Sequence, residues 1–444
     1  MKLLNILQIN TSETGGGAEK ICRELFSAYR KRGHGSWLAV KQKSSDNATI
    51  LKIPTPSRPL QRRLSQGRSW IERRLGWEEF NHPGCHQLFK LLPQKPDIIH
   101  AHNLHGNYFD LRILPMISQQ SPTVLTLHDA WLLSGHCAHS FDCQRWLTGC
   151  GKCPDLKIYP AIQRDATSYN WQRKRDIYKL SKLYIATPSQ WLMDKVRQSI
   201  LLPGIVQARV IPHGVDQSIF RAAAQKCARA ELGLPENVDI LLFMATRLKR
   251  NSWKDYETLH EALTQVVASQ PEHQILCLGL GEQASSEQLG ATEIRFLPHQ
   301  KSEKILARYY QAADLFVHSA KADTFPTVVL EALACGTPVV ATAVGGIPEQ
   351  VKGLCITNCE LNKYSIDEAT GILVSPKSAD EMAQALVTLL ADKKLRKRLS
   401  NNAVYDAQMR FDFSHLATTY LSWYNEILVS EAKTNTNPAN RIVS

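Results

Sequence analysis

Two acidic side chains bracket a predicted helix start in the run from residue 323 to residue 338, which reads DTFPTVVLEALACGTP. Pro326 suits the first turn of a helix, so the amides of Thr327 and Val328 are free donors at its positive end. Glu331 lies over one turn further along, where it can reach a pair of hydroxyls, and Asp323 lies in the loop ahead. The pattern indicates a phosphate and sugar site. From the residues alone, an amphipathic helix with a solvated Glu331 stays open as the alternative.

The same segment resembles the E-x7-E signature of the family 4 retaining glycosyltransferases, which have the GT-B fold. The resemblance implies that Asp323 contacts the donor sugar and Glu331 the ribose, while helix amides bind the diphosphate. It also assigns Phe325, Thr327 and Val328 to the donor site. Two positions depart from the family pattern, because Asp323 stands for the usual Glu and a proline at 326 for the usual Gly.

Two cations match the same family. Arg247 follows a predicted strand and Lys254 begins the next predicted helix, where the family carries an Arg or Lys and then a Lys. The resemblance implies that both neutralise the leaving nucleoside diphosphate, the largest electrostatic need of the reaction. Two surface cations among many are the alternative. Asp255 follows Lys254 where the family often has Gly.

Glycine-rich loops follow strands in both halves. The run from Gly279 to Ala284 fits the dinucleotide pattern, but no clear apolar stripe follows, so we expect no nicotinamide site. The resemblance makes it the donor-nucleotide loop. In the first half, Gly16 and Gly17 begin a helix and allow close approach of an anion. The family places them beside the donor phosphates, although a tight turn also explains them. The segment from 212 to 216 matches the family's hinge, with His213 for the usual Asn.

His128 follows a strand in Thr126-Leu-His-Asp-Ala-Trp131, at the usual ligand edge of a parallel sheet. The segment resembles the H-D-x-W motif of exopolysaccharide-type family 4 enzymes. The resemblance implies that His128 contacts the transferred sugar. It does not imply a general base, because the family is thought to react by same-face attack assisted by the leaving phosphate.

Four cysteines lie in one short insertion, residues 134–155, which related sequences also carry. A structural zinc site is one interpretation, although only the last pair has the tight C-x2-C spacing that zinc prefers. Reduced thiols packed in a loop are the other. The candidate ligands are Cys137, Cys143, Cys150 and Cys153.

Arginines recur between Arg58 and Arg74, interleaved with Leu60, Leu64, Trp70 and Ile71. As a helix this stretch is basic and amphipathic, and suits an anionic membrane surface. A solvated arginine face is the alternative. Nucleic-acid binding is not favoured, because no nucleic-acid module accompanies the charge.

These groups need a two-domain scaffold. A chain of 444 residues with 43% hydrophobic content supports two cores. A net charge of +12 predicts an anionic partner. The first ten residues read as a strand and not as a signal peptide, and every longer apolar run is too short to span a bilayer. Eleven cysteines, an odd number, favour a reducing cytoplasm without disulfides. We therefore expect a cytoplasmic protein, peripheral on the inner face of the membrane if the arginine-rich helix binds there.

Strand-like and helical runs alternate twice along the chain, which predicts two parallel α/β domains. Strands are expected at 3–9, 37–40, 97–101, 123–127, 183–186 and 208–211, and again at 240–245, 274–279, 294–297, 315–318 and 338–342. We expect an N-terminal acceptor-binding domain over 1–215, a C-terminal nucleotide-sugar domain over 216–410, a helix over 411–432 that packs back on the first domain, and a polar tail over 433–444.

The resemblance covers nearly the whole chain and implies a GT-B fold, with two Rossmann-like domains facing each other across a cleft. It implies retaining transfer of a hexose from a nucleoside diphosphate sugar to a hydroxyl of a glycan or polyprenyl-linked acceptor in polysaccharide biosynthesis. No Asp-x-Asp pair occurs in the sequence, so we expect no catalytic metal or other catalytic cofactor. Transfer to a soluble acceptor, as in sucrose or trehalose synthesis, and a non-catalytic sugar-nucleotide-binding homologue are the alternatives.

Overall fold

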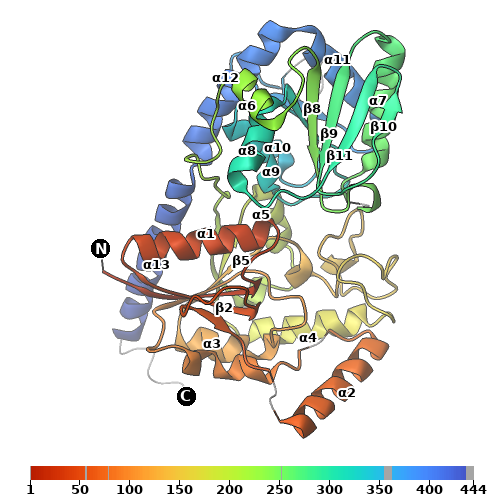
Figure 1. The fold of residues 1–444 in the computed structure, drawn as a ribbon. Helices are drawn as coiled ribbons and strands as arrows, with labels where there is room; N and C mark the ends of the chain where they lie inside the picture. The colour runs from red at the N-terminus through yellow and green to blue at the C-terminus, as the bar shows by residue number, and fades with distance from the viewer. Residues whose placement is uncertain (1, 56–57, 79, 252, 355–362, 437–444) are drawn as a thin grey trace. The chain divides into compact units, whose positions relative to one another are not determined.

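The computed structural model describes residues 2–55, 58–78, 80–251, 253–354 and 363–436 (Figure 1). The chain divides into two compact units, each built on one seven-stranded sheet. Unit 1 contains Met1–Ile211 together with Leu416–Ser444, and unit 2 contains Pro212–His415. The division thus lies four residues before the expected one, after residue 211 and not after 215.

Unit 1 has an entirely parallel sheet with strand order β3-β2-β1-β4-β5-β6-β7. The central strands β4, β5 and β6 are buried along their whole length, as expected of a parallel sheet with helices on both faces. The strands are β1 (Asn5–Ser12), β2 (Gly35–Gln42), β3 (Ile50–Lys52), β4 (Ile98–Ala101), β5 (Thr123–Thr126), β6 (Leu183–Thr187) and β7 (Ile205–Val210).

Helices cover both faces of this sheet, with α1 on one side and α3 and α4 on the other (Figure 1). Helix α1 begins after Gly16 and buries an apolar stripe that includes Leu25 and Tyr29. The helices are α1 (Gly17–Lys31), α2 (Pro59–Leu75), α3 (Leu114–Gln120), α4 (Thr167–Lys179) and α5 (Gln190–Val196).

Unit 2 repeats the design, with strand order β10-β11-β9-β8-β12-β13-β14. All neighbours are parallel except the edge pair β10 and β11. Without β10, the order is that of a doubly wound dinucleotide-binding sheet. The strands are β8 (Asp239–Met244), β9 (Ile275–Leu280), β10 (Glu287–Leu289), β11 (Thr292–Leu297), β12 (Leu315–His318), β13 (Val339–Thr342) and β14 (Gly371–Val374).

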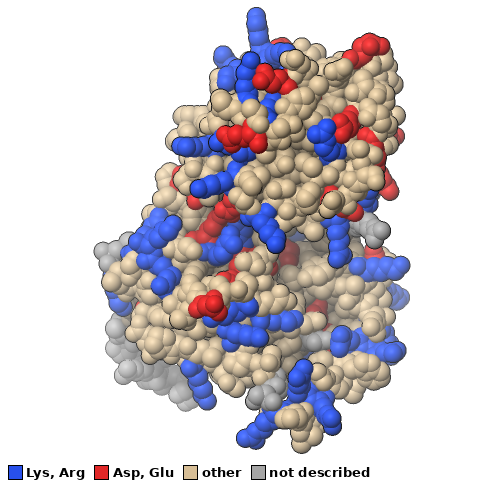
Figure 2. All heavy atoms as spheres, in the orientation of Figure 1, with Lys and Arg blue, Asp and Glu red and all other residues tan. Residues whose placement is uncertain are grey.

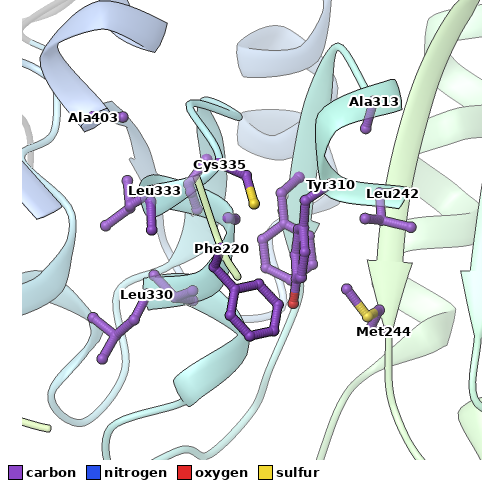
Figure 3. Close-up of a cluster of buried hydrophobic side chains, with 14 of the residues drawn as sticks. Phe220, Leu242, Met244, Tyr310, Ala313, Leu330, Leu333, Cys335 and Ala403 are labelled. Carbon is purple, nitrogen blue, oxygen red and sulfur yellow. The ribbon is translucent and has the colours of Figure 1, made fainter. Parts of the chain in front are cut away.

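The helices of unit 2 are α6 (Gln225–Leu232), α7 (Tyr256–Ser269), α8 (Glu303–Ala312), α9 (Thr327–Ala334), α10 (Ile347–Gln350), α11 (Ala379–Ala391) and α12 (Lys393–Arg410). Figure 3 shows the core beneath α9, where the rings of Phe220 and Tyr310 lie among aliphatic side chains of α9 and β8. The two rings meet edge to face with centroids 6.2 Å apart. This core fixes the position of Tyr310 on α8.

The last helix, α13 (Phe413–Thr436), packs on unit 1. Its Tyr424 hydroxyl lies 2.7 Å from Nδ1 of His100 and 3.1 Å from the Tyr29 hydroxyl, and all three residues are buried. Tyr420 bonds the hydroxyl of Thr126 at 2.8 Å. The polar interior of unit 1 is therefore completed by α13.

Most expected strands occur within two or three residues of their predicted ends. The short strands β3, β10 and β14 were not expected, and the loop after β9 leads into β10 and not into a helix. The expected polar tail begins inside α13, which continues to Thr436, and its remaining residues 437–444 lie outside the described part of the chain. None of the helices in the described part combines the length and apolar character needed to cross a bilayer.

Candidate functional site

The switch point of the unit 2 sheet lies between β8 and β12. These strands are neighbours, and the chain leaves them toward opposite sides of the sheet, to β9 and to β13. In doubly wound sheets this is where ligands bind, outside the carboxyl ends of the strands. Lys254 follows β8, and His318 ends β12 with Asp323 five residues later. The topology therefore brings Lys254, His318 and Asp323 to the same edge of the sheet.

Lys254, His318 and Asp323 form one cluster. The ammonium of Lys254 contacts Oδ2 of Asp323, and Nε2 of His318 lies 3.2 Å from the same oxygen. Burial opposes ionisation of Asp323, but the charge of Lys254 and the hydrogen bond from His318 outweigh it and hold the pKa of Asp323 well below its usual range. Burial and the Lys254 charge lower the pKa of His318. The neutral ring therefore donates its Nε2 proton to the carboxylate.

The backbone around this cluster is tightly constrained. Asp255 has φ of 45°, a left-handed conformation that glycine adopts more readily, which explains the glycine usual at this position in the family it resembles. The Ser319 hydroxyl ties β12 to this turn by bonding the carbonyls of Lys254 and Asp255 at 2.9 and 3.0 Å. A Cβ on Gly345 would lie 1.7 Å from the carbonyl oxygen of Asp323, so only glycine fits there.

Helix α9 begins directly after this loop. Pro326 is its N-cap in extended conformation and not its first helical residue, so the helix starts at Thr327. The amides of Thr327 and Val328 lie in the first turn, where an α-helix offers no acceptor of its own. The ring of Phe325 is only 6% exposed and meets His213 edge to face, with centroids 5.7 Å apart. Phe325 therefore anchors the loop by packing.

Glu331 is buried at 3% exposure, one turn into α9. The Tyr310 hydroxyl donates to its Oε2 at 2.9 Å. Burial and the charge of Glu331 raise the pKa of Tyr310 well above its usual value, so the hydroxyl stays protonated and donating. The carboxylate is thus held by Tyr310, whose ring belongs to the core of Figure 3, and it is not solvated as the alternative interpretation required.

The remaining donor-site candidates of unit 2 lie at the end of β9 and on the loops that follow β8 and β9. Arg247 is exposed, with φ of 55°. Gly279 is buried within β9, and a Cβ there would contact Leu248 at 3.0 Å. Gly281 has φ of 123°, and a Cβ would lie 2.2 Å from the carbonyl of Ala245. Close packing of the two loops thus explains the glycines, while Arg247 extends from the same turn.

In unit 1, His128 follows β5 at the carboxyl edge of the sheet. Its Nε2 lies 3.0 Å from Nδ1 of His102, which follows β4. A second pair lies beside it, because Nε2 of His105 is 2.7 Å from Oδ2 of Asp129. Burial lowers the pKa of His105, but the charge of Asp129 and this hydrogen bond outweigh it and raise that pKa overall. Gly16 and Gly17 are exposed at the start of α1, after β1.

The four cysteines line one small cavity together with His136. Nε2 of His136 lies 3.4 Å from Sγ of Cys153. Burial raises the pKa of Cys150 to about 12, and it also raises the pKa values of Cys137 and Cys153, which favours neutral thiols. Within the described residues, no three His, Cys, Asp or Glu side chains are placed to hold a metal ion. The thiols are therefore gathered, but they are not in coordinating positions.

Sequence reasoning missed several residues of these clusters, namely His102, His105, Tyr310, His318 and Gly345. A signal existed for three of them, because His102 and His105 lie within four residues after the predicted strand 97–101. His318 ends a predicted strand in the same way. Tyr310 and Gly345 carry no local signal, since their roles depend on contacts between distant segments.

Comparison with known families gives two matches that together take in most of the chain. Residues 15–218 match the sequence model of Glycosyltransferase Family 4, and residues 225–404 match that of Glycosyl transferases group 1. WcaC of Escherichia coli K12, whose name associates it with colanic acid biosynthesis, is 23% identical over 96% of this chain and 100% of its own. A D-inositol 3-phosphate glycosyltransferase of Mycobacterium avium is 32% identical, but the match spans 53% of each chain.

Solved structures share the architecture at low identity. Sucrose-phosphate synthase of Thermosynechococcus elongatus has a TM-score of 0.62 at 20% identity, covering 96% of this chain and 100% of that one. HepE of Anabaena, solved in complex with UDP-glucose, has a TM-score of 0.60 at 18% identity with the same coverage. These likenesses establish the GT-B fold, with two Rossmann-like domains.

Proposed function

Because this chain belongs to the family 4 glycosyltransferases, we propose that it transfers a hexose from a nucleoside diphosphate sugar to a hydroxyl of a glycan or polyprenyl-linked acceptor in polysaccharide biosynthesis. The observation that carries the proposal is the cluster of Lys254, His318 and Asp323 at the switch point of unit 2, directly ahead of α9. The Lys254 cation and the first amides of α9 suit the phosphates of a donor. The oriented carboxylate of Asp323 suits a sugar hydroxyl.

The donor diphosphate would lie at the start of α9. The amides of Thr327 and Val328 would donate to its oxygens, and Lys254 would share its charge between Asp323 and the phosphate. Arg247, exposed on the neighbouring loop, supplies a second cation. These groups stabilise the negative charge that develops on the leaving phosphate, where preorganised donors have their largest effect. The proposed reaction therefore needs no divalent cation.

Two carboxylates would hold the two ends of the donor. Asp323 would accept a hydrogen bond from a sugar hydroxyl and so orient the anomeric carbon. His318 keeps its Oδ2 oriented, since Nε2–H donates to it. Glu331, held by Tyr310, would accept from the ribose hydroxyls. His128 of unit 1 would contact the transferred sugar.

We propose transfer with retention of configuration. The bond from the anomeric carbon to the leaving phosphate oxygen breaks, and the acceptor oxygen bonds to that carbon on the same face. The acceptor proton passes to the leaving phosphate, so no protein base is required. Similarity to WcaC and to HepE, whose names and titles mention colanic acid and UDP-glucose, supports a polysaccharide product and a sugar nucleotide donor.

A membrane-linked acceptor is favoured by α2. Its Leu60, Leu64, Trp70 and Ile71 are between 51% and 69% exposed. Figure 2 shows blue, positively charged side chains gathered with tan residues at the lower edge, where Figure 1 places α2, and the positive side chains of α2 are arginines. Exposed apolar side chains among arginines suit the interface of an anionic bilayer. We propose that α2 brings the enzyme to lipid-linked acceptors.

Incubation with a panel of labelled sugar nucleotides and membrane extract, in chelator, tests this function. We expect one sugar nucleotide to label a lipid-extractable or polymeric product, and NMR of that product to show the anomeric configuration of the donor. Inversion of that configuration, or transfer only after a divalent cation is added, contradicts the mechanism. Failure of every sugar nucleotide to transfer contradicts the function.

A further inference from the structure

The carboxyl edge of unit 1 contains a hydrogen-bonded chain of three side chains, of which only His128 has a role in the proposed function. It runs from Gln8 on β1 to His102 after β4 and on to His128 after β5. Nε2 of Gln8 lies 3.4 Å from Nε2 of His102, and Nδ1 of His102 lies 3.0 Å from Nε2 of His128. Gln8 is fully buried, and His102 is 2% exposed. These three strands are adjacent in the sheet, so the chain is fixed by the fold.

The direction of the first bond follows from the backbone. Nε2 of Gln8 also lies 3.2 Å from the carbonyl oxygen of Cys22, which can only accept. The reverse amide orientation would set two carbonyl oxygens against each other. The amide nitrogen of Gln8 therefore faces Cys22, whose Sγ also lies 3.8 Å away, and His102, and it directs one proton toward each residue. Nε2 of His102 is consequently an acceptor and carries no proton.

The rest of the chain follows from the two forms of a neutral imidazole. Because His102 accepts at Nε2, its proton is on Nδ1, and Nδ1–H donates to Nε2 of His128. An imidazolium at His102 would direct a second donor at the Gln8 amide, which the geometry opposes. His128 accepts at Nε2 and thus has its own proton on Nδ1.

We propose that His102 is a positioning residue that holds His128 in one orientation and in the neutral tautomer protonated at Nδ1. Gln8 sets this state by donating to His102. The orientation of the His128 ring and the position of its proton are thereby fixed for the sugar contact proposed above. The tautomer is a property of unit 1 by itself, while its consequence for turnover rests on the proposed function.

The tautomer is tested first, by long-range 1H–15N correlation on the full chain with 15N-labelled histidine. The variant His128→Gln identifies the His128 signals by their loss. We expect His128 to show a protonated Nδ1 and a bare Nε2. Gln8→Met removes the donor while keeping the length of the side chain, and should move the two nitrogen signals of His128 toward each other as tautomers exchange. A proton on Nε2 in the native chain, or signals unchanged in Gln8→Met, overturns the proposal.

Turnover is tested with two substitutions of His102 that differ in one hydrogen bond. Asn places a side-chain N–H close to where Nδ1–H lies, whereas Leu has similar bulk and no donor. We expect His102→Leu to lower kcat roughly tenfold, the effect of losing about one neutral hydrogen bond, and His102→Asn to recover most of it. The KM for the donor should change little in either variant.

Thermal unfolding of both variants separates positioning from folding. Equal kcat losses in Asn and Leu variants of equal stability overturn the proposal. If the native chain transfers no sugar, the proposed function fails, but the NMR result still decides the tautomer. The two hypotheses can therefore fail separately.

Discussion

Lys254 and Asp323 contact each other through their charged groups although 69 residues separate them in the chain. Their side chains are only 21% and 16% exposed, so water screens the pair weakly. The ammonium is thus already positioned and partly desolvated before any phosphate arrives. Much of the cost of assembling this part of a donor site has been met during folding.

Removal of either cation should weaken binding of nucleoside diphosphates. A charge-assisted hydrogen bond contributes about 1.5 to 3 kcal/mol, so Lys254→Ala and Arg247→Ala should each raise the dissociation constant roughly tenfold or more. Calorimetry in chelator measures this, with Lys301→Ala, an exposed lysine of the same unit, as the control. Binding that disappears in chelator and returns with magnesium would show that the metal-free proposal is wrong.

Asp323 should affect turnover more than affinity. A hydroxyl contact that orients the anomeric carbon matters most as positive charge develops there, so Asp323→Ala should lower kcat about 100-fold. Asp323→Glu restores the usual family residue. We expect the longer side chain to impair the natural donor or shift donor preference, since His318 and Lys254 are positioned for the shorter one. Competition between sugar nucleotides measures this, and unchanged rates in both variants would remove this motif from the donor site.

The Lys254 charge should also determine the acid limit of activity. It helps hold the pKa of Asp323 below the usual range, so the carboxylate is ionised over the whole physiological range of pH. In Lys254→Met the pKa of Asp323 should rise, because burial then acts with less opposition. The acid limb of the kcat profile should therefore move to higher pH. A profile identical to that of the native chain would mean that Asp323 is not the group that titrates.

Glu331 should act mainly on donor binding. A ribose contact is similar in ground and transition states, so Glu331→Ala should raise the KM for the donor with little change in kcat. Tyr310→Phe removes only the hydroxyl that holds this carboxylate and should give a smaller increase, up to about tenfold. Steady-state kinetics with the donor varied test both. A fall in kcat at constant KM would place Glu331 at the sugar and not at the ribose.

Helix α2 should bind anionic membranes. Each arginine near such a surface contributes about 1 kcal/mol, so Arg62, Arg63 and Arg73 changed together to Gln should weaken vesicle binding on the order of 100-fold. Co-sedimentation with vesicles of anionic and of zwitterionic phospholipid measures this, with the three exposed lysines Lys393, Lys394 and Lys397 of α12 changed to Gln as the matched control. Equal binding to both kinds of vesicle would contradict an electrostatic role for α2.

Zinc in the cysteine cluster stays a prediction. Metal analysis of protein purified without chelator is expected to show about one zinc per chain. To bind zinc, the four thiols would have to move closer together around the cavity that they share and lose their protons. Cys150→Ser should abolish the metal, whereas Cys227→Ser, at an exposed thiol outside the cluster, should not. If the native chain is folded and contains no zinc, the zinc prediction is wrong and the four cysteines are packed thiols.

The sequence was sufficient where a local pattern determines the structure. The strand before His128 and the helix after Pro326 follow from apolar runs and a proline start, so the carboxyl edges of both sheets could be identified in advance. The residues that hold these site residues in place could not be predicted in this way. Tyr310 reaches Glu331 because α8 packs against α9, and the left-handed Asp255 reflects a turn held by Ser319. Such partners depend on tertiary packing, which no short window of sequence contains.

The return of α13 to unit 1 has a consequence for how the protein is made. The ribosome must synthesise all of residues 212–415 before Tyr420 and Tyr424 can reach Thr126 and His100. During that time the interior of unit 1 lacks its last hydrogen-bonding partners, whereas unit 2 is one continuous stretch of chain and is complete before α13 is made. A gene fragment for residues 1–211 would therefore yield an incomplete core, whereas a fusion of that fragment to residues 416–436 would restore it.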